Sequence, residues 1–266
     1  MVESGSNYQT MYLNHHFRID IYGGVGYCYI RKNACSVFKK MIVDTSMKKT
    51  MDVNKDQRMR YMGKYHRVTI RELQQMDITL VVLREPLERI VSAFLNQFVM
   101  RLNRKSPEMH DSIEEKLQIP AEEITFEAIV KSYLTQRNIN NHFWPQYDHL
   151  APIVYTHACR IESLWEDIFY TLGKDIADQY FRKPINSTSE IKRIDFPDAY
   201  QMSSKNLFDN WYNNRVLPTK ENFLVPAIRN SLLSIYEKDV ALWESYLSAR
   251  KVKGKQPPSL DMRSGI

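Results

Sequence analysis

The stretch ITLVVLREP, residues 78–86, contains the clearest strand signal in the sequence. Ile78–Leu83 is almost continuously apolar, which is typical of a strand buried on both faces of a parallel sheet. Arg84 ends the run, and Pro86 suits the first turn of a helix. Apolar side chains then recur on one helical face across residues 90–102. A strand followed directly by a helix is the repeating unit of α/β folds.

The same order of strand, loop and helix is found twice more. Val25–Ile30 is aromatic and β-branched and predicts a strand, after which a polar loop, residues 31–35, leads to Ser36 as the N-cap of a helix. Ile153–Ile161 predicts a third strand, and Ser163 opens the following helix with the spacing of a capping box. The chain from about residue 222 to 247 has helical periodicity. We therefore predict an α/β fold with a mostly parallel central sheet, flanking helices and a helical C-terminal part.

Length and composition indicate an ordinary folded protein. The 266 residues are 43% hydrophobic and 26% charged, and we expect one domain over residues 1–250 followed by a flexible basic tail over 251–266. Three cysteines are too few for a disulfide framework. No apolar run reaches membrane-spanning length, and the first twenty residues lack the apolar core of a signal peptide. We expect a cytoplasmic protein without a transmembrane segment.

Charged residues gather where ligands bind in α/β sheets, beyond the carboxyl ends of the strands. The net charge of +6 favours anionic ligands. After the first strand, Lys32 and Ser36 precede a helix N-terminus, which favours phosphate. After the next strand, Arg84 presents a planar guanidinium suited to the same group. The loop is not a Walker A motif, because Gly23, Gly24 and Gly26 lie before or at the start of the strand instead of following it. An exposed lysine and a structural ion pair of Arg84 are the alternatives.

A third polar segment, NNHFWPQ, residues 140–146, follows a predicted helix. His142 is suited to take a proton from a hydroxyl near neutral pH, although a structural role is the alternative. His142 and His149 have no acidic or cysteine partner at a metal-binding spacing. We therefore predict no metal site.

Several of these segments together resemble one family. YCYIRKNACSVFKK, VVLREPLERIVSAF and HFWPQ are similar, in this order, to the 5′-phosphosulfate-binding, 3′-phosphate-binding and His-aromatic-x-Pro-Gln segments of the Golgi-type carbohydrate sulfotransferases, sulfotransferase family 2. The strand and helix at VYTHACRIESLWED and the closing helix at IYEKDVALWESY also resemble that family. The similarity spans about residues 25–247.

The resemblance implies a P-loop-like α/β fold that uses 3′-phosphoadenosine 5′-phosphosulfate (PAPS) as sulfuryl donor without a metal. Arg84 and Ser92 would hold the 3′-phosphate, and His142 would be the base toward the acceptor hydroxyl. The residues that the resemblance assigns to the 5′-phosphosulfate are Lys32, Asn33, Ala34, Cys35 and Ser36. Lys32 would also assist departure of the bisphosphate.

The sequence departs from the family at three places. Arg31 replaces the usual proline and adds charge beside the donor, and Glu85 stands where aspartate is commoner. Asn140 and Asn141 replace an acidic residue often found before the histidine. We expect no membrane anchor of the kind found in the family, so its Golgi location is not carried over.

The family implies a glycan or glycolipid as acceptor, with no nucleic-acid partner. Contact with a membrane surface and the oligomeric state are left open. Two other functions compatible with the sequence are a small-molecule kinase on a related nucleotide fold and a nucleotide- or polyanion-binding protein without catalysis.

Overall fold

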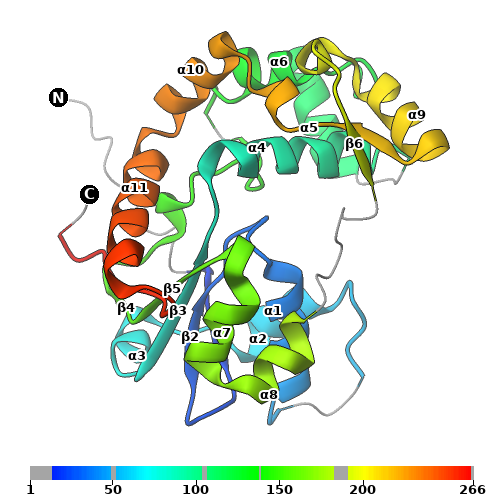
Figure 1. The fold of residues 1–266 in the computed structure, drawn as a ribbon. Coiled ribbons are helices and arrows are strands. Elements are labelled where there is room, and N and C mark those ends of the chain that lie inside the picture. Colours follow the sequence, from blue (N-terminus) through cyan, green and yellow to red (C-terminus); the bar gives the residue numbers. More distant parts are fainter. Residues whose placement is uncertain (1–13, 49–51, 104–106, 138, 183–190, 265–266) are drawn as a thin grey trace, which may run out of the picture. The chain divides into compact units, whose positions relative to one another are not determined.

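The computed structural model describes residues 14–48, 52–103, 107–137, 139–182 and 191–264 (Figure 1). Contacts within the chain divide it into two compact units. The first unit consists of Met1–Arg84, Pro145–Ile185 and Ala241–Ile266, and the second of Glu85–Trp144 and Asn186–Val240. The single domain expected over residues 1–250 stays a prediction.

The first unit contains a central four-stranded sheet and a separate two-stranded one. The strands of this unit are β1 (His16–Ile19), β2 (Val25–Cys28), β3 (Ile78–Leu83), β4 (Val154–Tyr155), β5 (His157–Arg160) and β8 (Leu260–Asp261). Its helices are α1 (Cys35–Thr45), α2 (Arg58–Tyr65), α3 (Ile70–Gln74), α7 (Leu164–Leu172), α8 (Lys174–Ile176) and the part of α11 (Glu237–Lys253) from residue 241 onward. Short 3₁₀ turns cover Tyr147–His149 and Ile161–Ser163, and a π-helical turn covers Ala177–Phe181.

The central sheet has the order β1-β2-β3-β5. β2, β3 and β5 are parallel, with Cys28 opposite Val81 and Val81 opposite Ala158, and β1 is antiparallel to β2. The prediction of an α/β fold with a mostly parallel sheet and flanking helices is confirmed. Because β2 and β3 are adjacent and parallel, the loops that follow them leave the sheet at the same edge.

Both faces of this sheet are buried. Tyr27, Leu80 and Val82 belong to one core cluster with side chains of α1 and α7. The alternate residues Cys28 and Val81 belong to another cluster, which includes side chains of α11. In Figure 1, β3 lies between α11 and α1. Burial on both faces explains why the strand sequences are continuously apolar instead of alternating.

The predicted strand positions are confirmed, with two differences in extent. β3 has the predicted bounds, whereas β2 ends at Cys28 instead of Ile30, and the run predicted over residues 153–161 is divided into β4 and β5. The glycines before β2 make a turn, as predicted: Gly23 and Gly24 have φ values of 81° and 121°. Gly26 lies in β2 and not in this turn, and a Cβ atom there would lie 2.7 Å from Leu73 Cδ2, so a larger residue would force the Leu73 side chain to shift.

The C-terminal segment differs from the solvated tail expected over residues 251–266. Leu260–Asp261 forms β8, which pairs antiparallel with β4. The side chains of Leu260 and Met262 are buried, and the Ala158 N–H donates to the Pro258 carbonyl over 2.8 Å. The tail expectation is therefore wrong for residues 257–262. That expectation was based on the basic residues within the segment, whereas the apolar surface that buries residues 257–262 comes from a distant part of the chain.

The second unit is mainly helical. Its elements are α4 (Pro86–Phe94), α5 (Pro107–Leu117), α6 (Phe126–Ala128), α9 (Ser204–Asn214), α10 (Pro226–Ile235), the start of α11, and the strands β6 (Lys192–Ile194) and β7 (Val216–Pro218). π-helical turns cover Leu95–Val99 and Ile129–Tyr133, and 3₁₀ turns cover Ala199–Gln201 and Glu221–Phe223. β6 and β7 pair in parallel, and the core contains the aromatic cluster of Phe94, Phe126 and Phe223. Among the described helices of either unit, none combines the length and apolar character that crossing a bilayer requires.

Candidate functional site

The loop after β2 makes a tight turn into helix α1. Lys32 and Ala34 both have positive φ, 70° and 55°, which is uncommon for residues other than glycine. Ala34 is the N-cap of α1, and no side chain within the described residues caps the helix there. The first-turn N–H groups and the positive end of the helix dipole are therefore suited to an anionic ligand.

The start of α1 differs by one residue from the prediction. Ser36 was expected to be the N-cap, but the helix begins at Cys35, because the left-handed backbone of Ala34 turns the chain into the helix. Ser36 thus lies in the first helical turn. Ala34, Cys35 and Ser36 are all half-buried, as are Arg31 and Lys32.

Asn33 has a different position from the rest of the loop. It is fully buried, and its side-chain amide donates to the Val82 carbonyl over 2.8 Å and to Gln146 Oε1 over 2.5 Å. Its backbone N–H donates to the Ile30 carbonyl. Both the side-chain amide and the N–H group of Asn33 are thus used inside the protein, where they fix the loop on the end of β3, and direct contact of Asn33 with PAPS stays a prediction.

Arg84, at the end of β3, is connected to the same loop. The Arg84 N–H donates to Gln146 Oε1 over 3.1 Å, and Gln146 Nε2 donates to the Arg84 carbonyl over 2.9 Å. The Arg84 guanidinium donates from Nη1 to the Lys32 carbonyl over 3.3 Å. The first unit thus brings Lys32 and Arg84 together at one edge of the sheet, with Asn33 and Gln146 as the buried link between their two loops.

The positive charges near this edge affect the pKa of a neighbouring imidazole, that of His15. The pKa of His15 is lowered to about 4, first by burial and then by the positive charges of Arg31 and Arg67. Burial raises the pKa of Cys28 to about 12, so this thiol stays protonated and is no nucleophile. Arg31 and Arg67 thus place positive charge beside His15, which suits an anionic ligand.

Ser92 and His142 belong to the second unit and are described there. Ser92 is half-buried on α4. The first turn of that helix is capped by Glu85, whose carboxylate accepts from the Glu88 N–H, and Glu88 forms an ion pair with Lys220. Glutamate at position 85 therefore serves as an N-cap, a role that the commoner aspartate also performs.

His142 lies half-buried in the loop between the π-helical turn Ile129–Tyr133 and residue 145. Its Nδ1 is 2.7 Å from Asn140 Oδ1, and the same oxygen accepts the His142 backbone N–H over 3.0 Å. Because the backbone N–H requires an acceptor, the amide oxygen must face His142. An amide oxygen only accepts, so Nδ1 donates to it, and in the neutral imidazole Nε2 therefore carries the lone pair. Asn140 thus orients the imidazole where the related enzymes often have an acidic residue.

Two residues of functional interest are not among those predicted from the sequence. Gln146 belongs to the HFWPQ segment and had no predicted role of its own, yet it makes three hydrogen bonds that connect the two basic loops. Arg89 was not singled out, although its side chain is fully buried and contacts the His142 loop. The sequence signal that could have identified Arg89 is an arginine within an otherwise apolar helical stretch, because a buried guanidinium needs dedicated partners.

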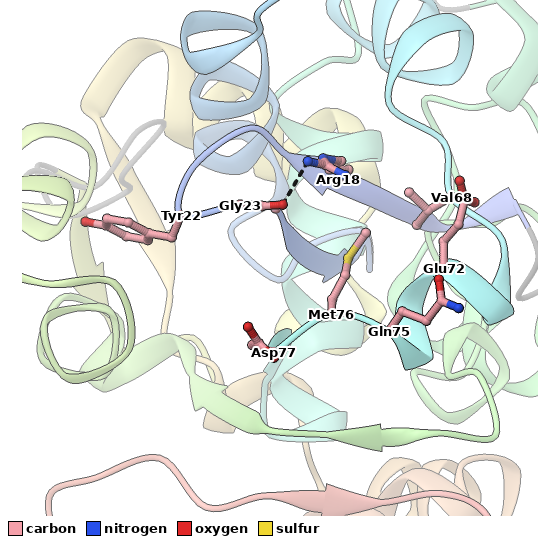
Figure 2. A pocket seen from close by; sticks show the side chains of 9 residues that line it. Arg18, Tyr22, Gly23, Val68, Glu72, Gln75, Met76 and Asp77 are labelled. Carbon is pink, nitrogen blue, oxygen red and sulfur yellow. Dashed lines mark hydrogen bonds between the residues drawn. The ribbon is translucent and has the colours of Figure 1, made fainter.

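A separate hollow of about 300 Å³ lies at the opposite edge of the sheet (Figure 2). Gly24, which precedes β2, and Asp77, which precedes β3, both line it. Its charged residues are of both signs, and the Arg18 guanidinium donates to the Gly23 carbonyl across one side. The hollow is therefore distinct from the basic loops and lacks their single sign of charge.

Comparison with known families agrees with this geometry. The model of the sulfotransferase family matches residues 15–246, which include both basic loops and the His142 loop. The chain belongs to the sulfotransferase family. No curated protein and no solved structure gives a significant match to this sulfotransferase-family chain. Within the described residues, no group of three or more His, Cys, Asp or Glu side chains is arranged to hold a metal ion.

Proposed function

We propose that this sulfotransferase moves a sulfuryl group from PAPS to a hydroxyl of a carbohydrate or glycoconjugate. The observation that carries the proposal is the linked pair of basic loops, in which the Arg84 guanidinium and Lys32 backbone are in direct contact beside the uncapped start of α1. A 3′,5′-bisphosphorylated nucleoside has two anionic groups, and two separate cationic loops match that requirement. Family membership supports the choice of sulfuryl chemistry.

The two loops have different tasks in this proposal. Lys32 and the N–H groups of residues 34–36 face the 5′-phosphosulfate, where negative charge grows on the bridging oxygen as the S–O bond breaks. Arg84 and Ser92 hold the 3′-phosphate, which distinguishes PAPS from ordinary adenine nucleotides. Arg31 adds positive charge beside the donor. Asn33 supports the loop from inside, as its buried hydrogen bonds indicate.

The transfer itself is an in-line displacement. The acceptor oxygen forms a bond to sulfur, the bond from sulfur to the 5′-phosphate oxygen breaks, and 3′-phosphoadenosine 5′-phosphate leaves. His142 takes the acceptor proton on Nε2, because Nδ1 is protonated toward Asn140. A general base of this kind contributes about 10²–10⁴-fold to the rate.

The test is transfer of radiolabelled sulfate from PAPS to a crude glycan mixture. We expect labelled product with the wild-type protein and little with Lys32→Ala or His142→Ala. Absence of PAPS-dependent labelling with the wild type would overturn the proposal. Calorimetry with 3′-phosphoadenosine 5′-phosphate and with ATP separates the remaining functions: preference for ATP indicates a kinase, and bisphosphate binding without transfer indicates a binding protein.

A further inference from the structure

Arg89 is a charged residue in the core of the second unit. Its side chain, on α4, has no exposed surface, and neither has that of Asp239 on α11. The closest atoms of the two charged groups, Arg89 Nη2 and Asp239 Oδ2, are 3.9 Å apart. Removing a guanidinium from water is costly unless its N–H groups are used. The position of Arg89 in the core therefore requires that acceptors inside the protein use its N–H groups.

Arg89 holds the backbone of the His142 loop. Its Nη1 donates to the His142 carbonyl over 3.4 Å, and its Nη2 donates to the Trp144 carbonyl over 2.5 Å. The carbonyl between them, that of Phe143, accepts from the hydroxyl of Tyr236 over 2.6 Å. Tyr236 is itself buried. Three successive carbonyl groups of an irregular loop are thus each bound by a buried side chain.

The preceding residues of the same loop are also fixed. The Asn140 N–H donates to the Tyr133 hydroxyl over 2.6 Å, and the Trp144 indole N–H donates to the Ile139 carbonyl over 2.8 Å. The result is a loop whose backbone is anchored at both ends while the ring of His142 stays partly exposed. A side chain on such an anchored backbone is held in position without being enclosed.

We propose that Arg89, with its partner Asp239, and Tyr236 are positioning residues that set the backbone of residues 142–144 and thereby the direction of the His142 ring. The inference rests on the proposed role of His142 as the base. Arginine is suited to the task because its planar fork reaches two carbonyl groups at once, whereas a lysine ammonium is a compact point charge. Asp239 keeps the buried guanidinium charge compensated.

The test compares two conservative variants with a matched control. Arg89→Lys keeps the charge but removes the fork, and Tyr236→Phe removes one hydroxyl. The control is Ser204→Ala, which removes another fully buried hydroxyl that donates to a carbonyl, that of Ile124 over 2.7 Å, away from the His142 loop. Tyr236→Phe removes the same kind of bond as the control, so general loss of stability is matched.

The first measurement is the ¹⁵N spectrum of the histidine rings, with the His142 signals assigned by their loss in His142→Gln. It requires no acceptor. We expect Nδ1 of His142 to be the protonated nitrogen in the wild type and in Ser204→Ala. In Arg89→Lys and Tyr236→Phe, we expect a mixture of tautomers, because the ring no longer faces Asn140 Oδ1 in a single orientation. A spectrum that is the same in all four proteins would overturn the inference.

The second measurement is steady-state transfer from radiolabelled PAPS to the glycan mixture. A displacement of about 1 Å in a reacting group is able to cost roughly 10²-fold in rate, so we expect kcat to fall by 10- to 100-fold in Arg89→Lys with little change in the KM for PAPS. In a His142→Ala background, the same substitution is expected to have no further effect on kcat. Equal losses with and without His142 would overturn the positioning role.

The two measurements separate this inference from the proposed function. If wild type transfers no sulfate, the proposed function fails, and the spectra still decide whether Arg89 and Tyr236 position the ring. If wild type is active and His142→Ala is inactive, but both positioning variants behave like Ser204→Ala, only the present inference fails.

Discussion

Replacing Gln146 with leucine tests whether the two basic loops depend on one buried side chain. Gln146 is almost fully buried, and leucine has a similar size without polar atoms. The substitution removes the hydrogen bonds to the backbone N–H and carbonyl of Arg84 and the bond from Asn33. Asn33 keeps its bond to the Val82 carbonyl. The change therefore leaves three groups without this partner: one Nδ2 N–H of Asn33 and the backbone N–H and carbonyl of Arg84.

The expected loss of stability follows from those three groups. Leaving a buried polar group without its partner costs about 1–3 kcal/mol, so the free energy of unfolding should fall by about 3–9 kcal/mol. Arg84 is half-buried, and solvent therefore compensates part of the loss, which favours a value of about 3 kcal/mol. For a chain of this length, that corresponds to a decrease in Tm of about 6–12 °C.

The assay is urea unfolding followed by circular dichroism, with Gln97→Leu as the matched control. Gln97 is also buried, but among the residues that the structure describes its side chain donates only to the side chain of Asn96, so its loss leaves no described backbone group without a partner. We expect Gln97→Leu to cost less than about 1 kcal/mol. Calorimetry should in addition show about tenfold weaker binding of 3′-phosphoadenosine 5′-phosphate to Gln146→Leu, equal to about 1.4 kcal/mol.

Two results would refute the reasoning. Equal stabilities of Gln146→Leu and Gln97→Leu would show that the link between the loops contributes nothing to folding. Unchanged bisphosphate affinity in a destabilised Gln146→Leu would show that the link is not needed for binding.

Three further predictions concern the first unit. Lys32→Ala should lower kcat with little change in the calorimetric affinity for the bisphosphate, whereas Arg84→Ala should weaken that affinity first; equal affinity in Arg84→Ala and wild type would show that the 3′-phosphate assignment is wrong. The pKa of His15 lies at about 4 in the folded protein, against 6.5 as the ordinary value, so the unfolded chain binds the extra proton between these pH values. Stability should therefore fall as the pH falls from about 6.5 to about 4, by up to about 3 kcal/mol from this group, and urea unfolding at pH 7 and pH 5 should show a smaller difference in His15→Gln. Truncation after residue 255 removes β8 with two buried apolar side chains, which should cost about 3–6 kcal/mol and lower the Tm; a truncated protein as stable as the full chain would contradict the observed packing.

Local sequence patterns predicted the framework of the fold well. The strand Ile78–Leu83 and the start of the next helix at Pro86 were located to the residue, because a doubly buried strand must be apolar throughout and proline is favoured at a helix start. Thr125 caps α6, because its hydroxyl accepts from the Ala128 N–H over 3.0 Å. Each of these features depends on neighbours within a few residues.

The predictions that failed depended on partners far along the chain. Ser163 was expected to form a capping box, but its hydroxyl donates to Asp167 Oδ2 over 3.0 Å. Asp167 is fully buried and also binds Arg250, eighty-three residues away. Nothing in the sequence around Ser163 indicates the ion pair between Asp167 and Arg250. The same holds for the C-terminal segment, whose apolar partner is β4.

The candidate site shows the same division. Its chemistry was predictable from the chain alone: basic residues directly after two strands, and a histidine in a polar loop, point to an anionic ligand and a base because residue type limits charge and proton affinity. The direction in which each side chain points was not predictable from the chain alone. Asn33 faces inward, where its amide donates to the Val82 carbonyl and to Gln146, 113 residues later, and Arg89 binds a loop more than fifty residues away. Local sequence sets which groups are present and which segments form strands and helices, whereas the pairing of buried polar groups is decided when distant segments pack and each donor needs an acceptor.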